Sequence, residues 1–444
     1  MFVRKLDPVD PLKLYNILRD YDYPFILESA EKHERKAKYI YLSSNPSFVI
    51  EICEYGTKVD GNKFSKERNP LKALKDFIEF GEFGEKFSGG LVGYVAYDAV
   101  HNYIGGEIRE PSVFAYYENC FVFDNSRNEL YYVCMSEDEI KKAETLISKA
   151  KRSEISKEDG CSEILRCDAD RDAFIEMVLD AKEYIFDGEA FQIVLSREYE
   201  IKTDLPSFQI YLNLRKVNPS PYMFLLEFEK SLVGASPETM ASVEGRLLKV
   251  NPIAGTVGRG RNEEEDNLLA KSMLSNEKEI AEHVMLVDLA RNDVRKVCRA
   301  GSVKVTKFME VVKYSHVQHI ESEVVGELDD SKDVFDAVEA AFPAGTLTGA
   351  PKIRAMEIIE ELEKSRRKIY GGCVGYFSVN GWSDLAIAIR MAEIDKICRV
   401  RAGAGIVADS DPKKEFLETE RLSLIHISEP TRPLYISYAV FCLK

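Results

Sequence analysis

The order of strand-like and helix-like segments constrains the fold of this chain more than any other feature. Runs typical of strands come in clusters, and amphipathic helical segments fall between the clusters. A doubly wound parallel sheet would need one helix between successive strands, and the sequence lacks that regular repeat. The chain is therefore predicted to be α+β.

Individual segments follow from their hydrophobic period. Strands are predicted over 39–42, 91–97, 191–201, 222–228, 247–250, 372–379, 384–391 and 397–402. Helices are predicted over 172–186, 276–287 and 348–362, and a further helix is expected to open with a capping box at 136–139.

A polar stretch at 151–162 divides the sequence. Before it lie strand-like runs, and after it the glycine-containing motifs become denser. Polar, glycine-containing stretches are typical of boundaries between folded parts. We therefore expect an N-terminal region at 1–150 and a catalytic region at 165–421.

The charge balance restricts the possible partners. The 75 acidic residues outnumber the 60 basic ones, which gives a net charge of −15. Nucleic acids and anionic membranes both require clustered cations, so neither is an expected partner. No apolar run reaches the roughly 18 residues of a membrane span, and the start lacks a signal-peptide core. A cytoplasmic protein with reduced, scattered cysteines is predicted.

Two pairs of glutamates have the spacing of a metal site. Glu279 and Glu282 are three residues apart on one predicted helix face, and Glu415 and Glu418 repeat that spacing. Such a pair is usually a solvated helix face. Four carboxylates from two helices would, however, suit a hard cation such as Mg²⁺. The spacing leaves open whether the two helices meet.

Several longer motifs occur together and in a specific order. They are PIAGT (252–256), EHVMLVDLARND (282–293), YSHVQHIES (314–322), FPAGTLTGAPK (342–352), YGGCVGYFS (370–378), AIAIR (386–390), RAGAGIVADSDP (401–412) and EFLETE (415–420). This order is similar to that of chorismate-utilising enzymes, and from about residue 10 to 421 the chain resembles the large subunits of anthranilate synthases. The resemblance implies an α/β/β/α sandwich with a cleft in its C-terminal part as the active site.

The same resemblance assigns roles to the acidic residues and the histidine. Glu282 and Glu418 would hold Mg²⁺ against the ring carboxylate of chorismate, while Glu279 and Glu415 would support the ion through waters. His319 would be the acid–base group near the ring, and Thr346 would share in catalysis. From residue type alone, His319 could equally be a packed or surface histidine, and His316 lies close to it.

Further residues are implied to bind the substrate. Tyr370 and Arg390 would clamp the enolpyruvyl carboxylate, the arginine through its planar two-point fork. Backbone N–H groups or hydroxyls would face the substrate carboxylates, because glycine allows close approach. These come from Gly255, Thr256, Thr346, Gly403 and Gly405. Turn geometry explains the glycines equally well.

Two positions distinguish the reactions within the family. Members that form aminodeoxychorismate resemble this chain but carry lysine in place of Ala254, and members that add water carry lysine in place of Gln192. Alanine cannot attack the substrate, and glutamine cannot deprotonate water. Ammonia needs no such base, so the resemblance implies Mg²⁺-dependent amination of chorismate with elimination of pyruvate to give anthranilate, the first committed step of tryptophan biosynthesis.

The ammonia requires a source, which in this family is a separate glutamine amidotransferase subunit. Cys373 lies in a GxCxG sequence that resembles a glutaminase nucleophile motif, but no histidine partner is evident for it. We therefore expect a hetero-oligomer in which the second subunit supplies ammonia.

The N-terminal region carries one half of a predicted regulatory pocket. Glu28 and Ser29, together with Pro221, Tyr222 and Met223, resemble the tryptophan feedback site of the family. Glu28 would meet the amino group and the later residues the indole, so that tryptophan acts as an inhibitor. The structural alternative is a prolyl turn packed on a helix cap.

Two rival functions remain, namely the large subunit of aminodeoxychorismate synthase and a non-catalytic tryptophan-sensing subunit. The final stretch, 422–444, resembles translated sequencing-adapter sequence and is predicted to be a non-native tail. Its Pro430 and Pro433 cannot continue a helix.

Overall fold

A computed structural model describes residues 1–29, 39–81, 87–314 and 317–424, with the side chains of 421–424 excepted. His316 and most of the predicted tail, 425–444, lie outside the described residues. Within them, no helix is long and apolar enough to cross a membrane.

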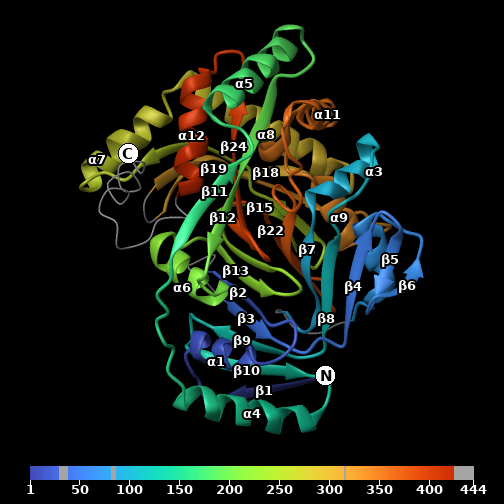
Figure 1. The fold of residues 1–444 in the computed structure, drawn as a ribbon. Helices are drawn as coiled ribbons and strands as arrows, with labels where there is room; N and C mark the ends of the chain where they lie inside the picture. Colours follow the sequence, from blue (N-terminus) through green and yellow to red (C-terminus); the bar gives the residue numbers. More distant parts are fainter. Residues whose placement is uncertain (30–38, 82–86, 315–316, 425–444) are drawn as a thin grey trace.

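Two large antiparallel sheets form the centre of the molecule (Figure 1). The first sheet contains, in spatial order, β1 (Phe2–Leu6), β10 (Glu129–Cys134), β9 (Cys120–Asp124), β3 (Tyr39–Ser43), β2 (Phe25–Glu28), β13 (Tyr222–Glu227), β14 (Ser231–Ser236), β23 (Met391–Ile394), β24 (Cys398–Ile406), β12 (Gln192–Thr203) and β11 (Ser162–Cys167), with β20 (Gly349–Ala350) beside β12.

The second sheet has the same number of strands. It runs from β17 (Ile253–Gly258) through β19 (Val317–Glu327), β16 (Leu247–Val250), β15 (Thr239–Glu244), β22 (Ser383–Ile387), β21 (Cys373–Ser378), β7 (Gly90–Val95), β8 (Ser112–Tyr117), β4 (Phe48–Cys53) and β5 (Gly56–Val59) to β6 (Asn62–Ser65), with β18 (Lys304–Lys313) beside β19.

Helices cover the outer faces of both sheets and one end of the first sheet. They are α1 (Pro11–Leu18), α2 (Pro70–Ala73), α3 (His101–Ile104), α4 (Glu137–Arg152), α5 (Arg171–Phe186), α6 (Ser207–Val217), α7 (Glu263–Met273), α8 (Glu277–Arg295), α9 (Val334–Ala341), α10 (Gly345–Thr348), α11 (Lys352–Leu362) and α12 (Pro412–Leu424).

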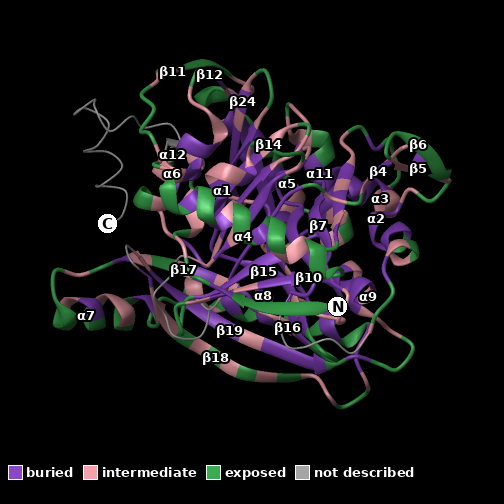
Figure 2. Cartoon of the chain, turned by 90° about the horizontal axis from the view of Figure 1, so that it is seen from below, coloured by how far each residue is buried: buried purple, intermediate pink, exposed green. Residues whose placement is uncertain are grey.

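Three hydrophobic cores define the layers. Helices α1, α4 and α6 pack on the first sheet, the two sheets pack on each other, and α8 and α9 pack on the second sheet. Figure 2 shows this buried interior, with exposed residues on the outer helices. The arrangement is an α/β/β/α sandwich, as predicted. A fourth core joins α5, α11 and α12 to β12 and β24.

Both sheets contain strands from both predicted regions. In the first sheet β2 pairs with β13, and in the second β7 pairs with β21. The segment at 151–162 therefore connects two parts of the chain that share their sheets.

Most predicted elements are present, and the differences have local causes. The predicted helix at 348–362 begins only at Lys352, because Ala350 precedes Pro351 and a residue before proline disfavours the helical conformation. The predicted strand at 384–391 is interrupted where Arg390 adopts a positive φ of 48°. At the start of α4, Ser136 caps the helix through Asp138 N, and Glu139 pairs with Lys142.

Candidate active site

Helix α8 presents two glutamates on one face. Its N-cap is Asn276, whose side chain accepts from the backbone of Lys278 and fixes the first turn. Glu282 Oε1 accepts a hydrogen bond of 3.0 Å from Gln192 Nε2 on β12. Burial and the neighbouring Glu279 carboxylate raise the pKa of Glu282.

Helix α12 brings the second pair of glutamates to the same place. Glu415 is buried, and burial raises its pKa. Part of Glu418 stays exposed, but desolvation of its carboxyl, followed by the carboxylates of Glu415, Glu282 and Glu279, raises its pKa to about 7. The carboxylates of Glu279, Glu282 and Glu415 therefore all lie close enough to Glu418 to repel its charge.

The donor chemistry of this glutamate cluster suits a hard divalent cation. Carboxylate oxygens are the ligands that Mg²⁺ prefers, and the repulsion that raises these pKa values would be relieved by a positive ion. Across the described part of the chain, no three His, Cys, Asp or Glu side chains form a ready-made metal group. Mg²⁺ commonly takes only one or two protein carboxylates and completes its shell with water and substrate. The residues present therefore fit it.

His319 is held by a bulge in the neighbouring strand. Gly255 has a φ of 64° and interrupts the β17–β19 register between Ala254 and Thr256. This brings Gly255 O and Thr256 Oγ1 each to 3.0 Å from His319 Nδ1. A carbonyl only accepts, so Nδ1 carries the hydrogen and Nε2 is left as the basic nitrogen.

The imidazole is neutral at physiological pH. Burial, with a contribution from the nearby Arg390 charge, lowers the pKa of His319 to about 4. A neutral ring with a free Nε2 can accept a proton from a substrate carbon and return it. A ring in this state is chemically able to take the predicted acid–base role.

Arg390 has a guanidinium group that is chemically able to bind a carboxylate. Among the residues that the structure describes, its guanidinium has no hydrogen-bond or ion-pair partner, although burial lowers its pKa. Its positive φ is unusual for a residue other than glycine, and such strain is common at functional sites. Tyr370 comes shortly before β21 in the chain, and its hydroxyl contacts the backbone of Gly403. Burial raises the pKa of Tyr370 to about 12.

Glu238 is a residue of this site that the sequence interpretation missed. It is buried directly before β15, and its Oε1 accepts a 2.8 Å hydrogen bond from Thr346 Oγ1. Burial raises the pKa of Glu238 to about 7, although Thr346 and Arg390 oppose the shift. A buried carboxyl with this pKa can donate a proton near neutral pH. Only the Ser236-Pro237-Glu238 sequence could have pointed to it, and that signal is weak.

The two glycines of β24 allow close packing beside the glutamate cluster. A Cβ at Gly405 would lie 2.6 Å from Gln192 Nε2, and a Cβ at Gly403 would lie 2.8 Å from Leu195 O. Both positions therefore need glycine for close approach. Gly405 in particular leaves room for the contact between Gln192 and Glu282.

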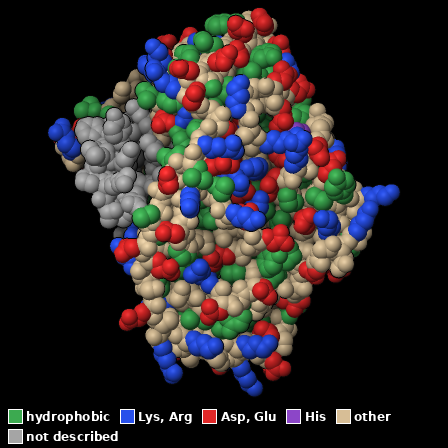
Figure 3. Space-filling view, viewed as in Figure 1, with side chains coloured by type: hydrophobic (Ala, Val, Ile, Leu, Met, Phe, Trp, Pro, Cys, Tyr) green, Lys and Arg blue, Asp and Glu red, His purple; other side chains and the backbone are tan. Residues whose placement is uncertain are grey.

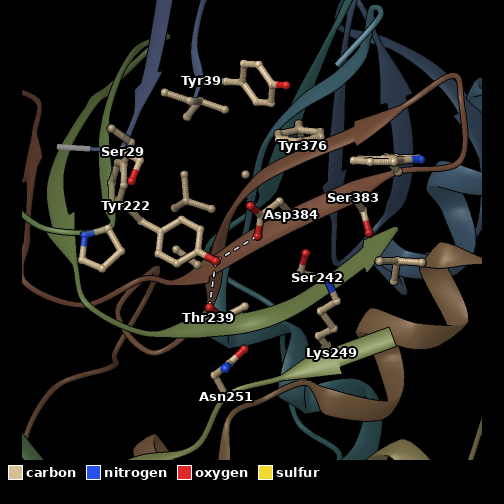
Figure 4. A pocket seen from close by; sticks show the side chains of 18 of the residues that line it. Ser29, Tyr39, Tyr222, Thr239, Ser242, Lys249, Asn251, Tyr376, Ser383 and Asp384 are labelled. Atoms are coloured by element: carbon tan, nitrogen blue, oxygen red, sulfur yellow. Dashed lines mark hydrogen bonds between the residues drawn. The ribbon is translucent and has the colours of Figure 1, made fainter. Parts of the chain in front are cut away.

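A separate cavity of about 640 Å³ lies between the sheets (Figure 4). All five residues of the predicted tryptophan pocket line it, namely Glu28, Ser29, Pro221, Tyr222 and Met223. Glu28 pairs with Arg215 at 2.6 and 2.8 Å and accepts from Tyr211 at 2.8 Å. Ser29 Oγ is buried without a hydrogen-bond partner among the described residues.

On the face seen in Figure 3, Lys and Arg side chains are interspersed with Asp and Glu side chains.

Cys373, in the sequence that resembles a nucleophile motif, is completely buried, and burial raises its pKa to about 12. A thiol in this setting is not poised as a nucleophile.

Comparison with known proteins agrees with this geometry. The model of the chorismate binding enzyme family matches residues 23–421. Anthranilate synthase component 1 of Thermococcus kodakarensis is 61% identical over 421 residues, which cover 95% of this chain and 97% of the relative. The protein of the same name from Archaeoglobus fulgidus is 54% identical over 418 residues, 94% of this chain and 97% of the relative.

Solved structures show the same architecture. The crystal structure of anthranilate synthase component I from Streptococcus pneumoniae has a TM-score of 0.80 and 34% identity, covering 90% of this chain and 95% of that one. The isochorismate synthase MenF from Escherichia coli, at 18% identity and a TM-score of 0.73 over 96% of this chain and 95% of that one, shares the fold. The chain thus belongs to the chorismate binding enzyme family, in the group of anthranilate synthase component 1.

Proposed function

We propose that the chain is the chorismate-converting subunit of an anthranilate synthase, a lyase that joins ammonia to chorismate and releases pyruvate and water. The observation that carries the proposal is the pair Ala254 and Gln192 within an otherwise complete acid–base site. Neither position offers the amine needed for covalent attack on the substrate or for deprotonation of water. Ammonia brings its own lone pair and needs neither.

Substrate binding would use the charges of the site. Arg390 would take the enolpyruvyl carboxylate, with Tyr370 beside it, because a guanidinium without a protein partner favours an anion. Glu282 and Glu418 would hold Mg²⁺, supported by Glu279 and Glu415. When bound, this ion would neutralise the ring carboxylate and fix the ring.

The chemistry would need one acid and one base. As ammonia adds to the ring at C2, a ring hydroxyl departs as water and must take up a proton, for which Glu238 is the buried acid. His319 would then remove the proton from C2 through Nε2, and pyruvate leaves as the ring becomes aromatic. Chorismate and ammonia thereby become anthranilate, pyruvate and water, so atoms balance.

The ammonia would come from a glutamine amidotransferase subunit, since the buried Cys373 offers no glutaminase chemistry. The name "component 1" of the relatives fits a protein that works with a second component. Tryptophan, the end product of such a pathway, would inhibit by binding in the cavity lined by Ser29 and Met223. Residues 1–150 would act as the regulatory part and 165–421 as the catalytic part, with 422–444 as a non-native tail.

The test uses purified chain, Mg²⁺, chorismate and either ammonium or glutamine. We expect fluorescent anthranilate with ammonium and none with glutamine until an amidotransferase partner is added. Glutamine-dependent turnover by the isolated chain would refute the proposal that a second subunit supplies the ammonia. Another product with ammonium would refute the reaction itself.

A further inference from the structure

Two consecutive residues of the chain face the large cavity and the active site, respectively. Glu238 and Thr239 are neighbours in the chain, and their side chains contact different elements. Glu238 accepts from Thr346 in the active site, whereas Thr239 contacts Tyr222, which lines the cavity. Thr239 also lines a small void of about 40 Å³ together with Glu238 and Thr346.

Tyr222 joins the two sheets through one hydroxyl. Its Oη lies 2.7 Å from Thr239 Oγ1 and 3.0 Å from Asp384 Oδ1 (Figure 4). The phenol has a single hydrogen, which the Asp384 carboxylate takes, so the Thr239 hydroxyl must donate to Tyr222. A residue of the first sheet therefore sets the orientation of a residue of the second sheet.

The strand at Thr239 can transmit a displacement. The register between β15 and β22 shifts between Thr239 and Ala241, so a bulge directly follows Thr239. The backbone N–H of Glu238 donates a hydrogen bond to Ser236 Oγ at 3.3 Å, and its carbonyl oxygen accepts one from Ile387 N at 3.0 Å. A displacement of Tyr222 would therefore move Thr239 and the adjacent Glu238. The contact between Glu238 and Thr346 lies in a close-packed interior, so a small shift would disturb it.

We propose that Thr239 is a positioning residue that couples occupancy of the cavity to the placement of the Glu238 carboxyl. A ligand that displaces the Tyr222 ring pulls the Thr239 hydroxyl with it and moves Glu238 away from the substrate. Inhibition then results from misplacement of the acid and does not require the ligand to enter the active site. This inference rests on the proposed function and specifies how its inhibition works.

The experiment compares binding with inhibition in the purified full chain. The dissociation constant of tryptophan is measured by calorimetry, and half-inhibition is measured from anthranilate formed with Mg²⁺, chorismate and ammonium. Thr239→Val removes the hydroxyl at nearly constant volume. We expect tryptophan still to bind within about threefold, while the concentration for half-inhibition rises about tenfold or more, the range of typical allosteric coupling.

Two further variants separate coupling from a structural defect. Thr239→Ser keeps a hydroxyl and should keep inhibition coupled to binding. Ser242→Ala removes another hydroxyl that lines the cavity from the same strand and should leave the ratio of inhibition to binding within about twofold of wild type. A melting temperature near that of wild type confirms that each variant is folded.

The outcomes distinguish the two claims. Wild-type protein that forms no anthranilate would overturn the proposed function. Wild-type protein that forms anthranilate, binds tryptophan and is inhibited to the same degree in Thr239→Val would overturn only the coupling. Failure of Thr239→Ser to restore inhibition would also contradict it, as would wild-type protein that makes anthranilate without binding tryptophan.

Discussion

Gln192 Nε2 donates a 3.0 Å hydrogen bond to Glu282 Oε1 and so ties β12 to α8 across the glutamate cluster. The other amide atom, Gln192 Oε1, is buried with no partner among the described residues. A buried acceptor of this kind is costly unless a ligand satisfies it. It is suited to an N–H donor such as ammonia.

This contact predicts the effect of Gln192→Ala. Without the amide donor, the Glu282 carboxylate loses a charge-assisted hydrogen bond, and protons compete more strongly with Mg²⁺ for it. Such a bond is worth about 1.5–3 kcal/mol, so the Mg²⁺ concentration for half-maximal activity should rise roughly ten- to hundred-fold. Lys202→Ala, on the exposed end of the same strand, is the control. An unchanged Mg²⁺ requirement in Gln192→Ala would contradict this role.

Gly405→Ala should disturb the same contact from the opposite side. Its Cβ would lie 2.6 Å from Gln192 Nε2 and push the amide away from Glu282. We expect a similar rise in the Mg²⁺ requirement, and the double variant with Gln192→Ala should be little worse than either single one, because both remove one interaction. At Gly381 an added Cβ meets no atom within 4 Å, and the φ of 77° makes alanine strained there, so Gly381→Ala controls for lost stability and should leave the Mg²⁺ requirement unchanged. Additive losses would argue against a shared cause.

His319→Gln should lower kcat far more than it raises KM. The amide can keep a hydrogen bond to Gly255 O but cannot act as a base, and loss of a general base typically costs about 10²- to 10⁴-fold. His283 offers a matched control. It is also buried, burial lowers its pKa to about 4 as well, and it bonds to Ser322 Oγ at 2.6 Å. His283→Gln should lose much less activity, and equal losses would show that His319 acts only through packing.

The raised pKa of Glu238 predicts a dependence of stability on pH. In the unfolded chain this carboxyl has its ordinary pKa of 4.5, and in the folded chain burial raises it to about 7. Between these values the folded state binds more protons, so stability falls as pH rises from about 5 to 8, by on the order of 2–3 kcal/mol for this group. Glu238→Gln should therefore flatten the fall in melting temperature across this range, measured without Mg²⁺. An equally steep fall in the variant would contradict the assignment.

The sequence predicted the fold class because strand clusters and helix periods are local signals. Phe174, Val178 and Ala181 form a buried stripe of α5 as their spacing indicates. The helix at 276–287 continues to Arg295 because nothing in its sequence ends it earlier. Local patterns could not reveal that β2 pairs with β13, since that pairing joins segments nearly two hundred residues apart in the chain.

The same limit applies to the site. The spacing of Glu279 and Glu282 places both on one face, but only the packing of α8 near α12 brings them to Glu418. The sequence did not indicate Glu238 as a site residue, because burial raises its pKa and burial cannot be read from the local sequence. The pairing of Glu28 with Arg215 was likewise invisible, because the two residues meet only in the folded chain.

The most direct test of the proposed reaction is the identity of the aminated product. Purified chain is incubated with Mg²⁺, chorismate and ¹⁵N-labelled ammonium, and the products are separated and weighed by mass spectrometry. We predict anthranilate that carries the label in its amino group, together with an equal amount of pyruvate. Labelled 4-amino-4-deoxychorismate, or unlabelled isochorismate, as the sole product would contradict the roles assigned to Ala254 and Gln192.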